Sequence, residues 1–385
     1  MGTFEEIISF IRDLYDEPQG FIPLHVPVFI GNEKSYLEEC IDSTFVSSVG
    51  KFVDSFEDKM AQFTGSKHAV ATVNGTSALQ IALILSGVEP GDEVITQPLT
   101  FIATANAITY CGAKPVFLDI DKNTMGLSAE KLEHFLKNST RYSKESARQI
   151  NVHTSRPVAA CLPVHTFGHP CQIDEIVRIC SHYNLPVVED AAESLGSFYK
   201  EKHTGTFGQV GILSFNGNKI MTTGGGGMLL TDDEKTASRA KHITTQAKVP
   251  HPWDFIHDET GYNFRMPNIN AALGVAQLEE IDRLVKNKRE TASLYKDFFN
   301  GVGFPFFSEP ESCRSNYWLN LFFLENREQK EAFLTYSNEN DVMTRPAWRL
   351  MHKLTMFQKE FRQSLDMAEL MEDTLVNIPS SYRLS

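Results

Sequence analysis

The stretch HAVATVNGTSALQIALIL, residues 68–85, decides the fold class. Its first part, His68–Val73, is a short apolar run typical of a buried strand, and Thr76–Leu85 has the length and spacing of a helix. The same alternation continues along the chain and predicts an α/β protein with a mainly parallel, doubly wound sheet. The further strands that we expect are Glu93–Gln97, Pro115–Ile120, Pro157–Val164, Leu185–Glu189, Val210–Ser214 and Gly226–Thr231, and the helices are Ile102–Tyr110, Leu127–Leu136 and one near residues 173–180.

The flanking segments follow other patterns. Helical spacing of Phe4, Ile7 and Ile11 predicts an amphipathic N-terminal helix. Apolar residues between Leu278 and Phe299 predict one long helix, whose apolar stripe Lys288 interrupts. We expect a strand at 317–324, loops at 137–154 and 247–262, an N-terminal helix and arm over 1–32, a large domain over 33–275 and a smaller α+β domain over 276–385.

Composition excludes several classes of function. The formal net charge is −13, and without a basic run such a chain repels nucleic-acid phosphates. No apolar run reaches the ~18 residues of a membrane span, and the acidic N-terminus is unlike a signal peptide. The six cysteines are scattered without CxxC spacing, so we expect a cytoplasmic chain with reduced thiols.

A lysine and a carboxylate occur where strands end. Lys219 closes the segment SFNGNK (214–219), just before Gly224–Gly227, and a buried lysine can form a Schiff base with an aldehyde cofactor. Asp190 ends the run VVED, at the edge of the sheet where α/β proteins bind ligands, and a carboxylate there suits a pyridine nitrogen. The alternatives are a solvated turn lysine and a helix N-cap.

Two weaker features complete the pattern. Asn74-Gly75-Thr76-Ser77 places free amides at a helix N-terminus, which suits a phosphate, although caps of this kind are routine. Phe101 follows a strand and can stack on a planar ring, although such an aromatic is more often part of the core.

In this order and spacing the chain resembles the DegT-type nucleotide-sugar aminotransferases, which are pyridoxal-phosphate enzymes of fold type I. The resemblance covers nearly the whole chain. It rests on the blocks VNGTSAL (73–79), TFIATANAI (100–108), VVEDAAESLGS (187–197), SFNGNK (214–219), GYNFRMPNINAALG (261–274) and NIPSS (377–381).

The resemblance implies a role for each matching residue. Lys219 is implied to be the catalytic lysine that binds pyridoxal 5'-phosphate, and Asn263 to reach the cofactor of the second subunit in a homodimer with shared sites. The other cofactor contacts implied are Gly75, Thr76, Phe101, Asp190, Ala192 and Ser214. Expected contacts on the substrate side are Glu193, Arg265, His165, Lys51, Arg345 and His352. For Lys51, a solvated surface lysine is equally plausible.

The resemblance also implies a reaction. L-Glutamate would donate an amino group, through pyridoxamine phosphate, to C4 of a UDP-linked 4-keto-6-deoxy-2-acetamido sugar, as in bacillosamine and legionaminic-acid pathways of surface-glycan synthesis. The alternatives are a dTDP- or GDP-linked sugar, a C3 ketone, or a non-catalytic regulatory protein. Glu193 departs from the Gln or His of many relatives, and Gly224–Gly227 from their Glu-containing turn. We expect no metal, although His165, His169 and Cys171 have ligand-like spacing.

Overall fold

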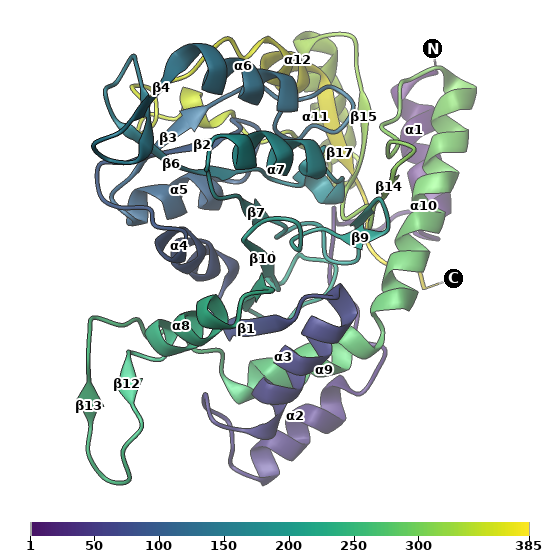
Figure 1. Ribbon diagram of the computed structural model, residues 1–385. Coiled ribbons are helices and arrows are strands. Elements are labelled where there is room, and N and C mark those ends of the chain that lie inside the picture. The colour runs from purple at the N-terminus through teal and green to yellow at the C-terminus, as the bar shows by residue number, and fades with distance from the viewer. Residues whose placement is uncertain (1, 385) are drawn as a thin grey trace.

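The computed structural model describes residues 2–384 and is built around one twisted, mixed sheet (Figure 1). Strands β3, β2 and β6 are parallel, and so are β7 and β10. Parallel bridges from Cys161 to Val187 and from Val164 to Asp190 join the two groups. β11 runs antiparallel between β10 and β1. The strands are β1 His68–Thr72, β2 Glu93–Thr96, β3 Lys114–Phe117, β6 Pro157–Leu162, β7 Val188–Asp190, β10 Val210–Ser214 and β11 Gly227–Thr231.

Helices cover both faces of this sheet, because its strands are apolar on both sides. In β11, Met228 and Leu230 pack toward helices α3 and α9, whereas Leu229 packs toward α4, α5 and α8. A strand that is buried on both faces explains the near-continuous apolar runs in the sequence. The helices of this part are α2 Glu33–Asp42, α3 Lys51–Thr64, α4 Gly75–Leu85, α5 Ile102–Tyr110, α6 Ala129–Ser139, α7 Ile173–His182, α8 Glu234–Thr244 and α9 Asn268–Glu279.

Two segments expected to be loops contain hairpins, so these predictions are wrong. Residues 137–154 include β4 Thr140–Ser143 and β5 Arg148–Asn151, which extend the sheet beyond β6. Residues 247–262 include β12 Lys248–Val249 and β13 Ile256–His257, which project from the body (Figure 1). Polar composition is misleading here because these short strands bury few apolar side chains, although Gln149, Ile150 and Asn151 of β5 are themselves buried.

The predicted long helix is confirmed as α10 Ile281–Val302, except that its first apolar residue, Leu278, belongs to the preceding helix α9. α9 ends at Glu279, and α10 begins after Glu280, whose backbone is not helical (ψ 2°). Apolar spacing continues across this break, so periodicity could not reveal it. Lys288 is buried on α10, and its ammonium donates to the backbone carbonyl of Ser380.

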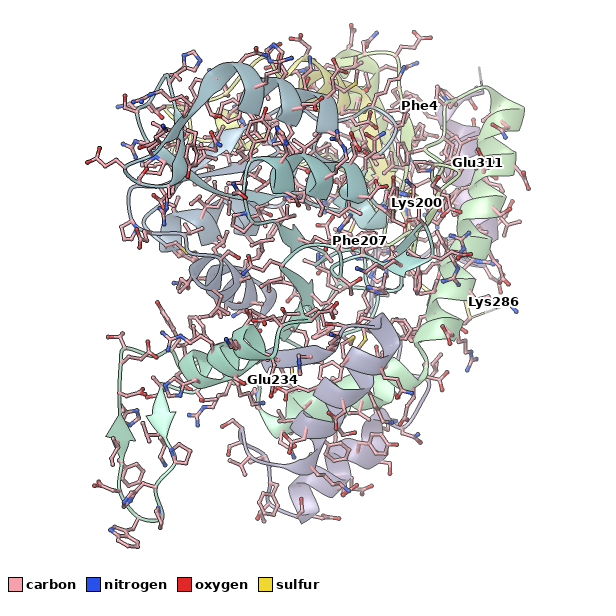
Figure 2. All side chains as sticks on the ribbon, in the orientation of Figure 1. Phe4, Lys200, Phe207, Glu234, Lys286 and Glu311 are labelled. Carbon is pink, nitrogen blue, oxygen red and sulfur yellow. The ribbon has the colours of Figure 1, made fainter. Side chains whose placement is uncertain are left out.

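The N-terminal helix is confirmed as α1 Phe4–Leu14, which begins with a capping box between Thr3 and Glu6. Its apolar face packs against α10, α11 and the strands of the C-terminal sheet (Figure 1). Figure 2 shows Phe4 in this region and Lys286 on the solvent side of α10. The remaining elements are α11 Arg327–Glu339, α12 Asp366–Thr374, β8 Phe198–Tyr199, β9 Lys202–His203, β14 Cys313–Arg314, β15 Asn320–Phe323, β16 Arg345–Pro346 and β17 Leu375–Ile378.

Strand β15 confirms the core of the strand expected at 317–324. The division at residues 32 and 275 stays a prediction. Between residues 2 and 384, none of the helices is both long enough and apolar enough to cross a membrane.

Candidate active site

A cavity of about 310 Å³ lies at the carboxyl ends of β7 and β10 and the N-terminus of α4. It brings together residues from segments that are far apart in the sequence. Those predicted as cofactor contacts that line it are Gly75, Thr76, Phe101, Asp190, Ala192, Ser214 and Lys219, and Glu193 lines it as well. The location agrees with the general rule for ligand sites in α/β sheets.

Lys219 lies between a carboxylate and an aromatic ring. Its Nζ is 3.6 Å from Oε1 of Glu193 and 4.0 Å from the centre of the Trp318 ring. The other carboxylate oxygen of Glu193 accepts from the backbone amide of Phe167 at 2.7 Å. Burial raises the pKa of Glu193 to about 7, although the charge of Lys219 acts in the opposite direction.

Asp190 is a buried carboxylate with one side chain and one amide as partners. Oδ2 accepts from the hydroxyl of Thr104 at 2.8 Å, and Oδ1 accepts from the backbone amide of Ala192 at 3.2 Å. Burial raises the pKa of Asp190. A cationic group in the cavity would stabilise the ionised form of this carboxylate, and a protonated pyridine nitrogen is such a group.

The opposite end of the cavity is formed by the first turn of α4. Asn74 caps the helix by accepting from the backbone amide of Ser77 at 2.8 Å. Gly75 lies against Ser214, because a Cβ on Gly75 would be 2.9 Å from the Cβ of Ser214. Similarly, a Cβ on Gly227 would be 2.5 Å from the carbonyl oxygen of Asn74. These glycines bring the α4 N-terminus and a hydroxyl to one place, which suits a phosphate.

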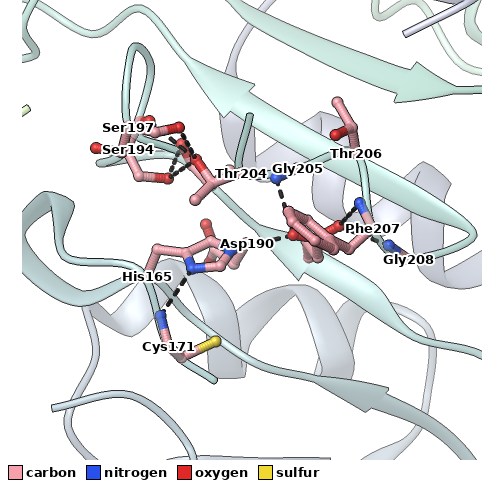
Figure 3. A network of polar contacts seen from close by, with 12 residues as sticks. His165, Cys171, Asp190, Ser194, Ser197, Thr204, Gly205, Thr206, Phe207 and Gly208 are labelled. Carbon is pink, nitrogen blue, oxygen red and sulfur yellow. Dashed lines mark hydrogen bonds and ion pairs between the residues drawn. The ribbon is translucent and has the colours of Figure 1, made fainter. Parts of the chain in front are cut away.

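A buried polar network lies beside Asp190 (Figure 3). His165 Nε2 is 3.1 Å from a carboxylate oxygen of Glu189, and His165 Nδ1 accepts from the backbone amide of Cys171 at 3.2 Å. Glu189 also accepts from the backbone amides of Gly205, Phe207 and Gly208. Although burial acts against its charge, the hydrogen bonds that Glu189 accepts lower the pKa of this carboxyl group. Because Nδ1 of His165 accepts a hydrogen bond, the ring carries its proton on Nε2 and donates it to Glu189 as a neutral imidazole.

His165, expected on the substrate side, thus lies in this network and not among the residues that line the cavity. His352 is buried near Glu369, with its Nε2 3.4 Å from the carboxylate. Lys51 is exposed and forms an ion pair with Glu39. Arg345 lines a neighbouring chamber, where its Nη1 donates to Oδ1 of Asn338 at 2.9 Å.

Asn263 and Arg265 lie outside the cavity of their own chain. The Arg265 guanidinium donates to Oδ1 of Asn263 at 3.2 Å, and Arg265 lines a shallow surface hollow next to the β12–β13 hairpin. Asn263 is exposed. The roles expected for Asn263 and Arg265 at a cofactor or substrate site therefore stay predictions.

The ligand-like spacing of His165, His169 and Cys171 does not produce a cluster of metal-binding atoms. Both ring nitrogens of His169 are buried without partners, and its ring lies against Phe307 and Tyr317. Within residues 2–384 the side chains close enough to share a cation are His242, Asp258 and Glu259 at the surface, and Arg239 already pairs with Glu259.

Sequence reasoning missed the aromatic and hydroxyl partners of the predicted residues. Thr104 lies one helical turn after Phe101 on α5, so its approach to Asp190 could have been expected from the helix. Trp318 and Trp348 also line the cavity, and Trp348 stacks on Phe167 with ring centres 4.6 Å apart. Nothing in the sequence relates these tryptophans to Lys219.

Together, the buried carboxylate of Asp190, the amine of Lys219 and the N-terminus of α4 suit the ring nitrogen, the aldehyde and the phosphate of pyridoxal phosphate. A model of the DegT/DnrJ/EryC1/StrS aminotransferase family matches residues 29–385. The chain belongs to this family. It is therefore a pyridoxal-phosphate-dependent aminotransferase of fold type I that acts in amino-sugar synthesis, which confirms the implied class of enzyme, fold and cofactor.

Several aminotransferases and related proteins align with nearly all of this chain. A GDP-perosamine synthase from Escherichia coli O157:H7 is 37% identical over 365 residues, which cover 95% of this chain and 94% of that protein. The aminotransferase TlmJ from Streptoalloteichus hindustanus has a TM-score of 0.84 with 26% identity and 94% coverage of each chain. Spr1654 from Streptococcus pneumoniae, in its PLP form, shares the fold, with a TM-score of 0.84, 21% identity and 95% coverage of each chain.

Proposed function

We propose that this aminotransferase converts a nucleotide-linked 4-keto-6-deoxy sugar to the 4-amino sugar with L-glutamate as donor. The observation that carries the proposal is the position of Lys219 in the cavity, next to Glu193 and on the same lining as Asp190. The name of the E. coli relative favours a GDP-linked sugar. The segment 24–53 favours the UDP-linked 2-acetamido sugar expected from the sequence. We take the GDP-linked sugar as the first candidate because the full-length comparison supports it.

Different residues of the cavity would have different roles in the reaction. Gly75, Thr76 and Ser214 would hold the phosphate of the cofactor, and Asp190 would hold its ring nitrogen. When bound, pyridoxal phosphate supplies an aldehyde carbon that carries the amino group and a ring that accepts electrons. The amine of Lys219 then moves the proton between the two carbons that exchange it, which requires an unprotonated Nζ. Glu193 lies within reach to exchange a proton with that Nζ.

A panel of substrates tests the proposal. Purified holoenzyme is incubated with L-glutamate and with GDP-, UDP- or dTDP-linked 4-keto-6-deoxy sugars, and the products are analysed by NMR. We expect an amino sugar and an equal amount of 2-oxoglutarate with the GDP-linked ketone. Lys219→Ala should form neither in repeated turnover. If all nucleotide sugars fail while cofactor remains bound, the proposal is wrong and a regulatory role gains support.

We further propose a homodimer in which each site uses both chains. Asn263 is exposed and does not line the cavity of its own chain. Large apolar side chains are exposed on the arm, on α2 and after it, and on the β12–β13 hairpin. A C2 interface would cover such a surface and bring Asn263 to the cofactor phosphate of the partner subunit. The exposed apolar residues are Val26, Phe29, Ile41, Phe45, Val46, Val49, Trp253, Phe255 and Ile256.

A further inference from the structure

A second chamber of about 460 Å³ adjoins the cavity that holds Lys219. Asn218, Trp318 and Trp348 line both, so the chamber begins where the cofactor cavity ends. Its other polar walls come from three distant segments: His25 on the N-terminal arm, Asn377 on β17, and Arg345 and Arg349 in the C-terminal region. A ligand that reaches Lys219 from this side must pass these residues.

Two buried acceptor atoms of the chamber walls have no partner. Asn377 donates from Nδ2 to the carbonyl of Pro346 at 3.3 Å, and its Oδ1 is unpaired. Nδ1 of His25 is also buried and unpaired. Burial and the positive charges of Lys288 and Lys219 hold the pKa of His25 well below its usual range. The ring is therefore neutral, and in the tautomer with its proton on Nε2 the buried Nδ1 accepts a hydrogen bond.

An unengaged cation lies at the rim of the same chamber. Arg349 is exposed, and no hydrogen bond or ion pair joins it to any part of residues 2–384. Arg345 differs, because its guanidinium already donates to Asn338 and to the carbonyl of Thr344. Arg349 can therefore bind an anion without losing an existing partner.

We propose that this chamber binds the sugar and diphosphate of the nucleotide-linked substrate, an inference that rests on the proposed function. Hydroxyl groups of the sugar donate to His25 Nδ1 and Asn377 Oδ1, and the diphosphate binds Arg349. Leaving a buried acceptor unpaired is unfavourable, so a ligand rich in donors gains from these two atoms. The amino-acid donor fits poorly, because its carboxylates only accept and its amino group must point to Lys219.

Binding measurements on the holoenzyme test the chamber. The probes are GDP-mannose and UDP-N-acetylglucosamine, with GDP and UDP as probes that lack the sugar, and affinity is measured by calorimetry. His25→Phe should lower the affinity for the sugar-carrying probe about tenfold, corresponding to about 1.4 kcal/mol, and leave the affinity for GDP or UDP within about twofold of wild type. Arg349→Ala should weaken both kinds of probe about tenfold, and Arg349→Lys should restore part of the loss.

The matched control is Arg141→Ala, which removes an exposed arginine on β4 and should change neither affinity. A single-turnover reaction with L-glutamate alone should proceed at the wild-type rate in all variants. Equal affinity of His25→Phe and wild type for both sugar probes would overturn the subsite. Variants that bind the sugar probes normally but react more slowly with L-glutamate would overturn it as well. If the wild-type protein binds neither sugar probe and aminates no keto sugar, the proposed function itself fails, and the subsite fails with it.

Discussion

Nζ of Lys219 lies 3.6 Å from Oε1 of Glu193, in a cavity where burial raises the pKa of that carboxyl group to about 7. Glu193 is consequently neutral at pH 6 and ionised at pH 8, so it can either donate a proton toward Lys219 or accept one within the pH range of an activity assay.

The first prediction concerns this carboxyl group. Wild-type kcat/KM should change with pH near pH 7, whereas Glu193→Gln, which cannot ionise, should lack that transition. The measurement is a profile from pH 6 to 9 with saturating glutamate and varied keto sugar. Glu201→Gln on an exposed turn is the control and should keep the transition. A transition unchanged in Glu193→Gln would assign it to another group.

The second prediction concerns Asp190. Asp190→Asn preserves the shape and the contact with Thr104 but removes the charge that would hold a cationic ring nitrogen. Loss of one charge-assisted contact costs about 1.5–3 kcal/mol, so cofactor affinity should fall by roughly ten- to a hundredfold, and turnover should fall further. Absorbance titration of the apoprotein with pyridoxal phosphate measures the affinity. Asp174→Asn, at a half-buried position on α7 where the carboxylate pairs with Lys200, should match wild type in cofactor affinity. Activity of Asp190→Asn within twofold of wild type would point to another carboxylate.

The third prediction tests whether sites are shared between subunits. A mixed dimer pairs one chain carrying Lys219→Ala with one carrying Asn263→Asp. If Asn263 serves the partner, both lesions fall in one site, the other is intact, and about half of the wild-type activity should remain. If each chain uses its own Asn263, both sites are damaged and activity should be far lower. A fully active monomer in sedimentation would also contradict the shared site.

The fourth prediction concerns His169, whose buried ring lacks hydrogen-bond partners. Burial lowers the pKa of His169 to about 3, so between pH 6.5 and 3 the unfolded chain binds a proton that the folded chain does not. The free energy of unfolding should therefore fall with decreasing pH below 6.5. His169→Phe should abolish the contribution of His169 to this loss, which approaches about 1.4 kcal/mol per pH unit. Urea unfolding at pH 7 and pH 5 measures the difference. An equal loss in both proteins would assign the acid sensitivity elsewhere.

The fifth prediction concerns the buried network around Glu189. Glu189→Ala leaves three backbone amides and the Nε2–H of His165 buried without their acceptor. Each buried donor left unpaired costs about 1–3 kcal/mol, so the urea midpoint should fall sharply. Glu189→Gln, which retains a carbonyl oxygen as an acceptor, should lose less stability. A Glu189→Gln variant no more stable than Glu189→Ala would contradict this interpretation of the network.

The sequence alone was sufficient for the sheet and for the cofactor side of the cavity. Strands such as His68–Thr72 and Val210–Ser214 are short apolar runs, and the carboxyl ends of parallel strands necessarily meet at one edge. Asp190 and Lys219 could therefore be placed together from local patterns. The start of α10 after Leu278 and the two hairpins escaped prediction, because periodicity records which residues are buried and not where the chain changes direction.

The substrate side was decided only by the tertiary structure. Trp318 contacts Lys219, and His25, Arg349 and Asn377 meet in one chamber, although these residues come from the two ends of the chain. The patterns around them resemble those of ordinary surface or core positions. Their meeting depends on how the N-terminal arm and the C-terminal elements pack against the large sheet, which results from burial summed over many contacts. Local spacing carries no information about such long-range contacts, whereas the cofactor residues follow from strand ends that one sheet brings together.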